Sequence, residues 1–356
     1  MRKLASIQEI AELVSIPEAD RIELAKIKGW RAVVKKGQFK VGDKCVFIEI
    51  DSVLPDIPLF DFLRDSKGKI KPIKTQRIRG VISQGLVMPI DIISGGNKLD
   101  IDTNVTDELG IKKKEDKTIV KWYKQFNKVP TLSFPAFIHK TDEERVQNLQ
   151  NCLDRHIGVD FVVTEKLDGT SFTAYIKDGH FGICSRNMEI PLDTVCTYQY
   201  VAFKYMLKEK FEKLRAENTI PYDFAIQGEI IGKGIQGNKY ELQDLDCRLF
   251  NFINLNTGEE MGFYFSNTDE FKRFNGIALG QIAYYLNMET VPILIDDFEM
   301  INDIDKIVEM SYGKSVLNPE HNREGIVFRA KYNSDIDKSI TRLSFKAINP
   351  AFLLKE

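Results

Sequence analysis

A short apolar run that ends in a polar loop constrains this chain more than any other stretch. Residues 159–163 are predicted to form a buried strand, and the next residues read Thr-Glu-Lys-Leu-Asp-Gly-Thr. Lys166 therefore stands between Glu165 and Asp168, where Gly169 allows the chain to turn. A lysine at a strand end suits a nucleophile, provided that its surroundings shift its pKa from about 10.4. Because Lys-Leu-Asp-Gly could equally form an ordinary solvated turn, the interpretation depends on the polar residues further along the chain.

Length and charge restrict the classes of protein to which the chain can belong. The chain has 356 residues, which is enough for two domains, and its net charge of −2 provides no general attraction for nucleic acid. A nucleic-acid surface would therefore be a local patch. No stretch reaches the ~18 apolar residues of a membrane helix, and the N-terminus lacks the apolar core of a signal peptide. We expect no membrane partner.

The sulfur and imidazole side chains do not form a recognisable metal motif. Five cysteines and four histidines are scattered along the chain without the spacing of a zinc site. An odd number of dispersed cysteines favours reduced thiols, so we expect a cytoplasmic protein.

Residues 1–110 are predicted to form a separate β domain. Alternating or apolar strands at 24–34, 45–50 and 79–89 are separated by glycine turns, which favours a small barrel of the OB-fold type. A basic strip precedes the last strand, and it could either contact an RNA backbone or be a solvated loop. The residues that we predict to bind RNA are Lys71, Lys74, Arg77 and Arg79.

Residues 111–133 are polar and lysine-rich and are predicted to be a linker, followed by an α+β domain over residues 134–356. Thr141 and Glu144 fit a capping box, which predicts a helix to about residue 154 that carries an exposed Arg145. Further helices are expected at 196–217, 268–286 and 301–310. In the first of these, an apolar stripe at helical spacing is predicted to face the core: Tyr200, Phe203, Leu207, Phe211 and Leu214.

Several predicted strands of this domain carry a polar residue at a strand end or inside the strand. Glu229 lies inside an apolar strand at 224–231, where a carboxylate is costly unless it faces a polar cleft. Residues 232–237 match Gly-x-Gly-x-x-Gly, but no apolar-faced helix follows, so a dinucleotide site is not expected. In chain order, the prominent positions on the strands are Lys166, Arg186, Glu229, Phe252, Glu324 and Lys346.

These positions, in this order, resemble the motifs of the covalent nucleotidyltransferases, which include RNA ligases, DNA ligases and messenger-RNA capping enzymes. Lys-Leu-Asp-Gly at 166–169 resembles motif I, and Ser-Arg-Asn at 185–187 resembles motif Ia. Gly-Glu at 228–229 resembles motif III, and Leu-Phe-Asn-Phe at 249–252 resembles motif IIIa. Residues 324–329 and 344–346 resemble motifs IV and V. The resemblance implies a nucleotidyltransferase catalytic domain of the ATP-grasp-like, DNA/RNA ligase type.

Within this superfamily the chain is most similar to the Naegleria-type ATP-dependent RNA ligases, which carry an OB domain before the catalytic domain. Residues 140–147, 234–240 and 345–350 resemble that group. DNA ligases and capping enzymes place the OB domain after motif V, whereas few residues follow Lys346 here. DNA ligases also have an arginine at the position of Ser171. One departure is Ile348, which occupies the place of a second motif V lysine.

The resemblance implies joining of RNA 3′-OH and 5′-phosphate ends through an adenylated Lys166, with ATP and Mg²⁺ or Mn²⁺. Lys346 would neutralise the α-phosphate, Arg186 would meet a phosphate, and Arg145 would reach the outer phosphates. Phe252, or alternatively Phe250, would stack on adenine. The residues expected to contact ATP or AMP are Arg145, Glu165, Lys166, Leu167, Asp168, Gly169, Arg186, Glu229, Phe252, Glu324 and Lys346. Those expected to hold the metal, largely through its waters, are Asp168, Glu229 and Glu324.

Other functions remain open on the sequence. A capping guanylyltransferase would use GTP, and a DNA ligase would seal deoxyribose ends. A non-catalytic RNA-binding relative would be expected to have lost part of the polar set. We expect the protein to act as a monomer with RNA as its partner.

Overall fold

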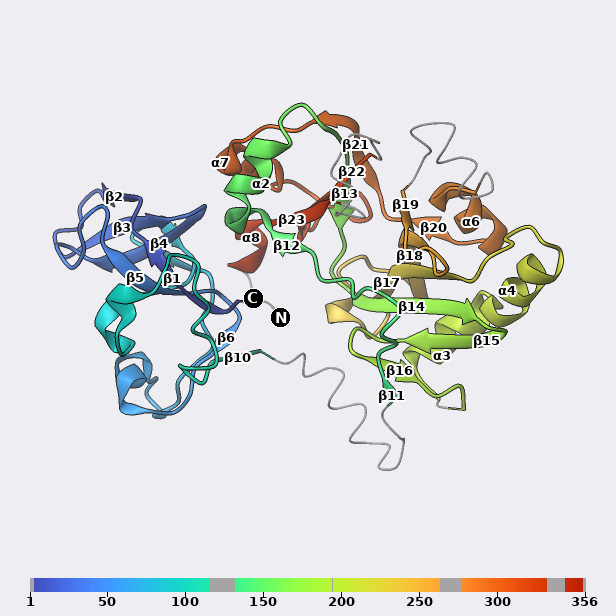
Figure 1. Ribbon diagram of the computed structural model, residues 1–356, viewed down its shortest axis with the longest axis horizontal. Helices are drawn as coiled ribbons and strands as arrows, with labels where there is room; N and C mark the ends of the chain where they lie inside the picture. The colour runs from blue at the N-terminus through green and yellow to red at the C-terminus, as the bar shows by residue number, and fades with distance from the viewer. Residues whose placement is uncertain (1–2, 115–131, 194, 263–276, 332–342, 355–356) are drawn as a thin grey trace. The chain divides into compact units, whose positions relative to one another are not determined.

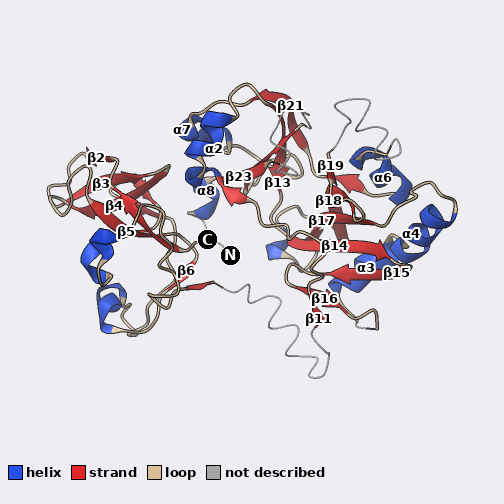
Figure 2. Ribbon diagram, viewed as in Figure 1, coloured by secondary structure: helices blue, strands red, loops and turns tan. Residues whose placement is uncertain are grey.

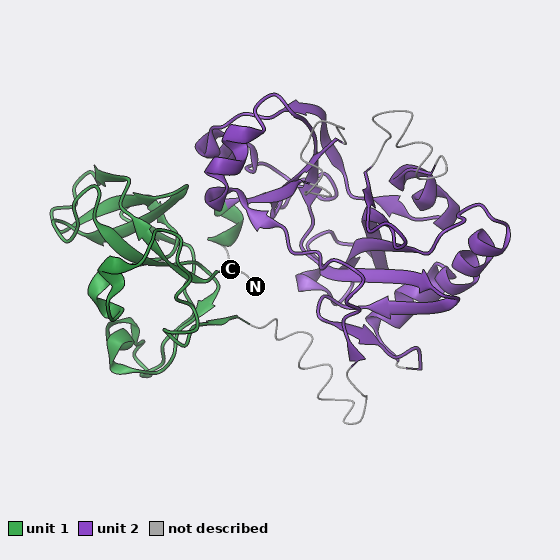
Figure 3. Cartoon of the chain, viewed as in Figure 1, with its two compact units in different colours: residues 1–122, 350–356 green, residues 123–349 purple. Residues whose placement is uncertain are grey.

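The computed structural model describes residues 3–114, 132–193, 195–262, 277–331 and 343–354 (Figure 1). The chain divides into two compact units, Met1–Trp122 with Pro350–Glu356, and Tyr123–Asn349 (Figure 3). The final residues thus group with the first unit, whereas the sequence analysis places them in the catalytic domain. The reason is apolar packing, because Leu353 of helix α8 (Pro350–Leu353) packs against the core of the first unit. Residues 115–131 of the expected linker lie outside the described residues.

The first unit is built from short antiparallel strands, as its alternating sequence predicts. In β4 (Trp30–Lys35), Trp30, Ala32 and Val34 are buried while Arg31 and Lys35 are exposed, which is the two-residue period of a half-buried strand. Trp30 lies against Phe47 in the core, with ring centroids 5.8 Å apart. The sheets have the strand orders β1–β5–β9, β2–β3–β4, β10–β6 and β7–β8. The remaining strands are β1 (Ala5–Glu9), β2 (Glu12–Ser15), β3 (Ile22–Ile27), β5 (Lys44–Ile48), β6 (Ser52–Val53), β7 (Gln76–Ile78), β8 (Val81–Ser83), β9 (Leu86–Pro89) and β10 (Lys112–Lys113).

The described residues of the second unit form two sheets, and strands make up most of their regular structure (Figure 2). The larger has the order β11–β16–β15–β14–β17–β18–β19, with β20 also paired to β18. Its strands are β11 (Leu132–Ser133), β14 (Thr170–Lys177), β15 (His180–Cys184), β16 (Met188–Ile190), β17 (Phe224–Gly232), β18 (Leu245–Asn254), β19 (Glu260–Met261) and β20 (Glu289–Thr290). The smaller has the order β12–β23–β22–β13–β21. Its strands are β12 (Glu144–Arg145), β13 (Asp160–Lys166), β21 (Ile293–Glu299), β22 (Gly325–Ala330) and β23 (Ser344–Ile348).

Strand β13 belongs to the smaller sheet and β14 to the larger, so the loop 167–169 crosses from one sheet to the other. Gly169 passes very close to β17 at this crossing. A Cβ atom on Gly169 would lie 2.3 Å from the carbonyl oxygen of Ile230 and 2.8 Å from Cγ of Glu229. Glycine is therefore required here for a close approach of backbones, in addition to its use in turns.

The helix expected at 141–154 is absent over its first half, and this prediction is wrong. Glu144 and Arg145 form β12, which pairs in parallel with Phe345 and Lys346 of β23. The hydroxyl of Thr141 does not cap a helix; it hydrogen-bonds to the hydroxyl of Ser171 at 2.7 Å. Strand pairing therefore overrides the local capping signal, and the short α2 (Gln150–Arg155) begins only after a 3₁₀ turn at Val146–Asn148.

The single helix expected at 196–217 is two helices, α3 (Thr197–Lys204) and α4 (Leu207–Ala216). Met206 between them has a left-handed backbone with φ +52°, which breaks the helical repeat. The predicted apolar stripe is consequently divided. Phe211 of α4 is buried against Phe181 and Phe224, whereas Phe203 of α3 is 81% exposed.

The other two helices are shorter than predicted. α7 (Ile304–Met310) starts late because the Asp303 carboxylate accepts the backbone N–H of Lys306 at 3.1 Å and so caps the helix. α6 covers Leu279–Leu286, and residues 268–276 of its expected range lie outside the described residues. Within the described parts of the chain, no helix is long and apolar enough to span a bilayer.

Candidate active site

Lys166 lies at the end of β13, and pairing with β22 brings a carboxylate to it. Lys166 is opposite Gly325 in the antiparallel register, so Glu324 stands directly beside the lysine. The Lys166 ammonium donates to Glu324 Oε2 at 2.5 Å. These two residues are far apart in the sequence, and their strands lie side by side in the smaller sheet (Figure 1).

Glu229 reaches the same place from the larger sheet. It lies within β17, and its Oε1 accepts the backbone N–H of Gly169 at 3.1 Å. The close approach of Gly169 to β17 thus fixes the carboxylate against the loop that follows the lysine. This hydrogen bond gives the carboxylate a polar partner inside an otherwise apolar strand.

The electrostatics of this cluster are dominated by burial and by an excess of carboxylates. Burial by itself would lower the pKa of Lys166, but the negative charges of Glu324, Glu229 and Asp168 outweigh it and raise that pKa. Burial raises the pKa of Glu229 to about 8 and also raises the pKa of Glu324. Both carboxyl groups are therefore harder to ionise than exposed ones, and an added cation would stabilise their ionised forms.

A neighbouring segment, which the sequence analysis does not assign to the site, holds the lysine loop. The hydroxyl of Tyr240 accepts the backbone N–H of Asp168 at 2.7 Å, and the ammonium of Lys239 forms an ion pair with the Asp168 carboxylate. The side chain of Asn318 donates to the carbonyl of Lys239 at 2.9 Å. The resemblance of residues 234–240 to the Naegleria-type RNA ligases indicates that this segment matters. The roles of its individual side chains depend on tertiary contacts.

Glu165 and Leu167 have their side chains inside the protein. The Glu165 carboxylate is 1% exposed and accepts the backbone N–H of Val316 at 2.8 Å, and Leu167 is also buried. These two side chains anchor the loop. Of the three consecutive residues 165–167, only Lys166 is directed to the carboxylate cluster.

Phe252 is placed in the hydrophobic core, which corrects the expectation that its ring stacks on adenine. It has 0% exposure and packs against Phe224 and Tyr222, with ring centroids 5.8 and 6.4 Å away. A register shift between β17 and β18 at Gln227 and Gly228 leaves Phe250 outside the regular pairing. Phe250 is half-buried, and the guanidinium of Arg329 lies over its ring at 5.2 Å from the centroid.

The remaining cationic residues of the predicted site lie on the same unit. Arg145 of β12 is paired with Lys346 of β23 and is only 6% exposed, so it is not the surface arginine expected from composition. The charge of Lys346 acts on Glu324. Arg186 forms an ion pair with Asp142. Ile348, in the place of a second lysine, is a buried residue opposite Gly325.

A second polar arrangement joins β22 to the segment before β12. Arg329 pairs with Glu143 at 3.3 Å and donates to the Thr164 hydroxyl at 3.2 Å. Glu143 also accepts a hydrogen bond from Ser344 of β23. No sequence pattern indicates the Glu143 contacts, because they join residues nearly 200 positions apart.

The comparisons with known proteins agree with this geometry. A family model described as RNA ligase matches residues 159–348, and one described as an OB-fold domain matches residues 4–90. The chain belongs to the RNA ligase family. The Naegleria gruberi RNA ligase, solved as a mutant with AMP and Mn, is 33% identical over 100% of this chain and 99% of that chain, with a TM-score of 0.81. The same ligase with PPi is 33% identical over 99% of this chain and 98% of that chain, with a TM-score of 0.80. No curated protein sequence matches the chain.

These matches confirm the predicted fold class, an N-terminal OB-fold domain followed by an α+β ligase domain. In this ligase, Asp168, Glu229 and Glu324 surround one lysine. In the part of the chain that the structure describes, no three Asp, Glu, His or Cys side chains are close enough to chelate a metal directly. The carboxylate oxygens of Asp168, Glu229 and Glu324 are nevertheless donors that suit a hydrated cation, which they would hold through its waters.

The OB-fold domain of the ligase presents its predicted RNA-binding strip to solvent. Lys71, Lys74, Arg77 and Arg79 are all exposed. Arg79 lies at the turn between β7 and β8 with φ +48°, and Arg77 donates to the carbonyl of Gly80 at 3.1 Å. The ammonium of Lys71 lies 3.4 Å from the Asp65 carboxylate, so part of the strip's charge is already offset.

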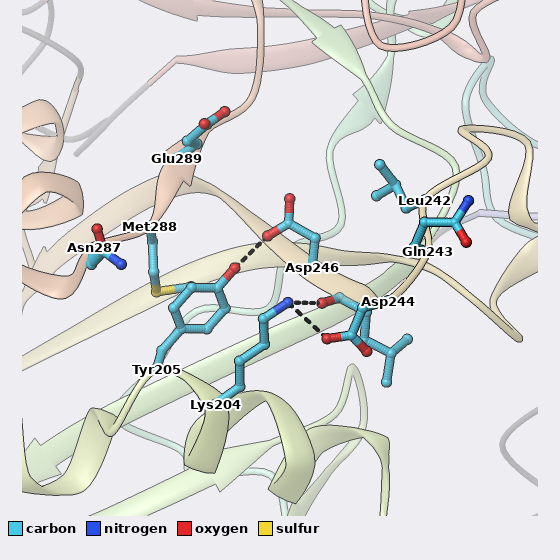
Figure 4. Close-up of a pocket in the computed structure, with 10 residues that line it drawn as sticks. Lys204, Tyr205, Leu242, Gln243, Asp244, Asp246, Asn287, Met288 and Glu289 are labelled. Atoms are coloured by element: carbon cyan, nitrogen blue, oxygen red, sulfur yellow. Dashed lines mark hydrogen bonds and ion pairs between the residues drawn. The ribbon is translucent and has the colours of Figure 1, made fainter.

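A cavity of about 490 Å³ lies apart from these motif residues, between the end of α3, the start of β18 and the segment after α6 (Figure 4). Its polar groups are directed at one another. Lys204 donates to the Leu245 carbonyl and pairs with Asp244, and the Tyr205 hydroxyl donates to Asp246. With Glu289 also in its lining, the cavity is acidic and does not suit the phosphates of a nucleotide.

The raised pKa of Glu229 predicts a pH dependence of stability. Between about pH 4.5 and 8 the folded protein keeps a proton on Glu229 that the unfolded chain releases, so the free energy of unfolding falls as pH rises through this window. Glu229→Gln removes this contribution. Melting temperatures of wild type and variant, measured from about pH 5 to 9, should diverge in favour of the variant at high pH. Parallel curves would contradict the assigned protonation.

Proposed function

We propose that this ligase joins RNA 3′-OH and 5′-phosphate ends through a lysyl-AMP intermediate on Lys166, with ATP as the adenylyl donor and Mg²⁺ or Mn²⁺ as the cation. The observation that carries the proposal is the contact of the Lys166 amine with Glu324, with Glu229 and Asp168 beside it. The similar Naegleria gruberi ligase has been solved with ATP, AMP and Mn, which supports the same ligands here.

In the first step, Nζ of Lys166 attacks the α-phosphorus of ATP, a P–N bond forms, and the P–O bond to pyrophosphate breaks. The amine must be neutral to attack, whereas its carboxylate neighbours favour its charged form. A bound divalent cation, held through waters by Asp168, Glu229 and Glu324, would supply the positive charge that favours the neutral amine. Glu324, 2.5 Å from Nζ, is placed to receive the proton.

In the second step, an oxygen of the RNA 5′-phosphate attacks the AMP phosphorus and the P–N bond to Lys166 breaks. In the third, the RNA 3′-hydroxyl attacks the activated 5′-phosphate and AMP leaves. Lys346 would neutralise charge on the α-phosphate, and Arg145 and Arg186 would bind further phosphate groups. Arg145 lies beside Lys346 in the parallel pairing of β12 and β23, which supports a shared phosphate site.

For the adenine ring, Phe250 is the better candidate. Phe250 is half-buried and its ring lies beneath the Arg329 guanidinium, while Phe252 is 0% exposed. An aromatic face of this kind can stack on a base.

We further propose that the ligase acts as a cytoplasmic monomer. All five cysteines are free in the structure, although a disulfide-permissive compartment would favour their pairing. Four of them are buried, and burial raises the pKa of thiols such as Cys45 and Cys184. Such thiols are poorly reactive. The monomeric state is tested separately, by measuring the size of the protein in solution.

The covalent step is tested with ATP labelled at the α-phosphate. Wild type should retain label after denaturation, with ATP favoured over GTP. Lys166→Ala should retain none, because the attacking amine is removed, while Lys233→Ala, at an exposed lysine, should label normally. Sealing of a pre-adenylated RNA strand by Lys166→Ala should persist. Normal labelling of Lys166→Ala would exclude this lysine as the nucleophile.

Substitution of the two phenylalanines of motif IIIa should have different effects on ATP binding and on stability. Phe250→Leu should raise the KM for ATP by about 5-fold or more, since stacking on a base contributes about 1–3 kcal/mol, with little change in melting temperature. Phe252→Leu should instead lower the free energy of unfolding by about 1 kcal/mol or more and leave the KM nearly unchanged. The opposite result would indicate that Phe252, and not Phe250, stacks on the adenine ring.

RNA binding by the OB-fold domain is tested by salt dependence. Replacing the strip residues with glutamine should weaken RNA binding equally across sequences and reduce the salt slope by up to about 0.7 for each phosphate that is no longer neutralised. A control variant removes the same charge from exposed lysines elsewhere in the domain and should keep the wild-type slope. The test variant changes Lys71, Lys74, Arg77 and Arg79, and the control changes Lys35, Lys36, Lys40 and Lys98. Equal slopes in both variants would remove the strip from the RNA site.

A further inference from the structure

The segment 232–241 has an unusual backbone for a stretch that contacts the site. Three of its non-glycine residues, Gln236, Asn238 and Glu241, have φ of +43°, +51° and +54°. A left-handed conformation costs about 1–2 kcal/mol for residues such as Gln236 and Glu241, so surrounding contacts must hold the segment in this shape. Backbone strain of this kind gathers at functional sites, which makes the contacts of this segment relevant to the site.

The contacts converge on Asp168 through two consecutive residues. Lys239 places its ammonium on the Asp168 carboxylate, and Tyr240 accepts the Asp168 backbone N–H at 2.7 Å. Asn318 binds the Lys239 carbonyl at 2.9 Å, and the Asn238 side chain bonds to both backbone groups of Leu242. Most of the surface of the Asp168 and Lys239 side chains is buried.

The hydrogen bonds to main-chain atoms and the Lys239–Asp168 ion pair have different consequences. The Tyr240 hydroxyl and the Asn318 amide bind main-chain atoms, so they tie the segment to its surroundings whatever the charge of residue 239. The Lys239 ammonium is thus not required to hold the segment in place. It contributes a positive charge beside a carboxylate in a cluster that holds Asp168, Glu229 and Glu324 around Lys166.

We propose that Lys239 is a positioning residue that occupies the cation position at Asp168 in the nucleotide-free enzyme and competes with the divalent cation for it. The inference rests on the proposed function, because that function places a divalent cation beside Asp168. An ammonium and a hydrated divalent ion that share one largely buried carboxylate repel each other. Entry of the cation therefore requires Lys239 to leave, and the ion pair keeps the Asp168 carboxylate neutralised until then.

The test uses the full-length chain with Lys239→Met, which keeps most of the apolar stem and removes the charge. Mn²⁺ binding without ATP, followed by the electron paramagnetic resonance signal of free Mn²⁺, should become at least about threefold tighter, because the competing charge is gone. Lys233→Met, an exposed lysine of the same segment, should bind Mn²⁺ as wild type does, and Lys239→Arg should remain close to wild type.

A second measurement covers the case in which Mn²⁺ binds too weakly without ATP. The Mg²⁺ concentration for half-maximal adenylation of Lys166 should fall at least about threefold in Lys239→Met, with the rate at saturating Mg²⁺ changed less than that concentration. Unchanged or weaker cation dependence in a variant that melts like wild type would overturn the proposal and leave Lys239 a structural tether. If Lys239→Met does not fold, Lys239→Gln takes its place in both measurements.

Failure of the inference and failure of the proposed function give different results. Wild type that forms no lysyl-AMP from ATP would contradict the proposed function directly. Wild type that adenylates normally, beside a Lys239→Met variant with unaltered cation dependence, would contradict only the role assigned to Lys239.

Discussion

The contact between Lys166 and Glu324 is the interaction on which the rest of the site depends. It exists because β13 and β22 pair with Lys166 opposite Gly325, so the residue before β22 falls beside the amine. A shift of one residue in this register would turn Lys166 to the other face of the sheet and separate the pair. Gly325 is also required on the other side of β22, where it approaches β23, since a Cβ there would lie 2.3 Å from the Ala347 carbonyl.

The same arrangement opposes the chemistry until a ligand arrives. Carboxylates around an amine favour its protonated form, which cannot attack phosphorus, and their burial keeps Glu229 and Glu324 reluctant to ionise. Positive charge brought by a cation would reverse both effects. Before a cation binds, these carboxylates therefore favour the protonated amine of Lys166, which is not a nucleophile.

The crossing of the chain from one sheet to the other explains how a short loop brings Glu229 and Glu324 close to Lys166. Loop 167–169 runs from the smaller sheet to the larger, so each end of it lies against a different set of strands. Glu324 approaches from the smaller sheet and Glu229 from the larger, and Gly169 makes the second approach possible. One short loop is thereby in contact with carboxylates from both sheets.

The sequence by itself determined the order of the motifs, and its resemblance to the RNA ligases predicted the OB-fold and ligase domains that the comparisons confirm. The same resemblance implied the roles of Lys166 and its neighbouring carboxylates, which are part of the proposed function. Only the tertiary structure decided which face each side chain occupies. A register shift in β18 leaves Phe250 half-buried while Phe252 is fully buried, and pairing with β23 places Glu144 and Arg145 in a strand where a capping box predicts a helix. Lys239 and Glu143 could not be assigned in advance, since their partners lie 71 to 201 positions away and sequence spacing carries no signal over such distances.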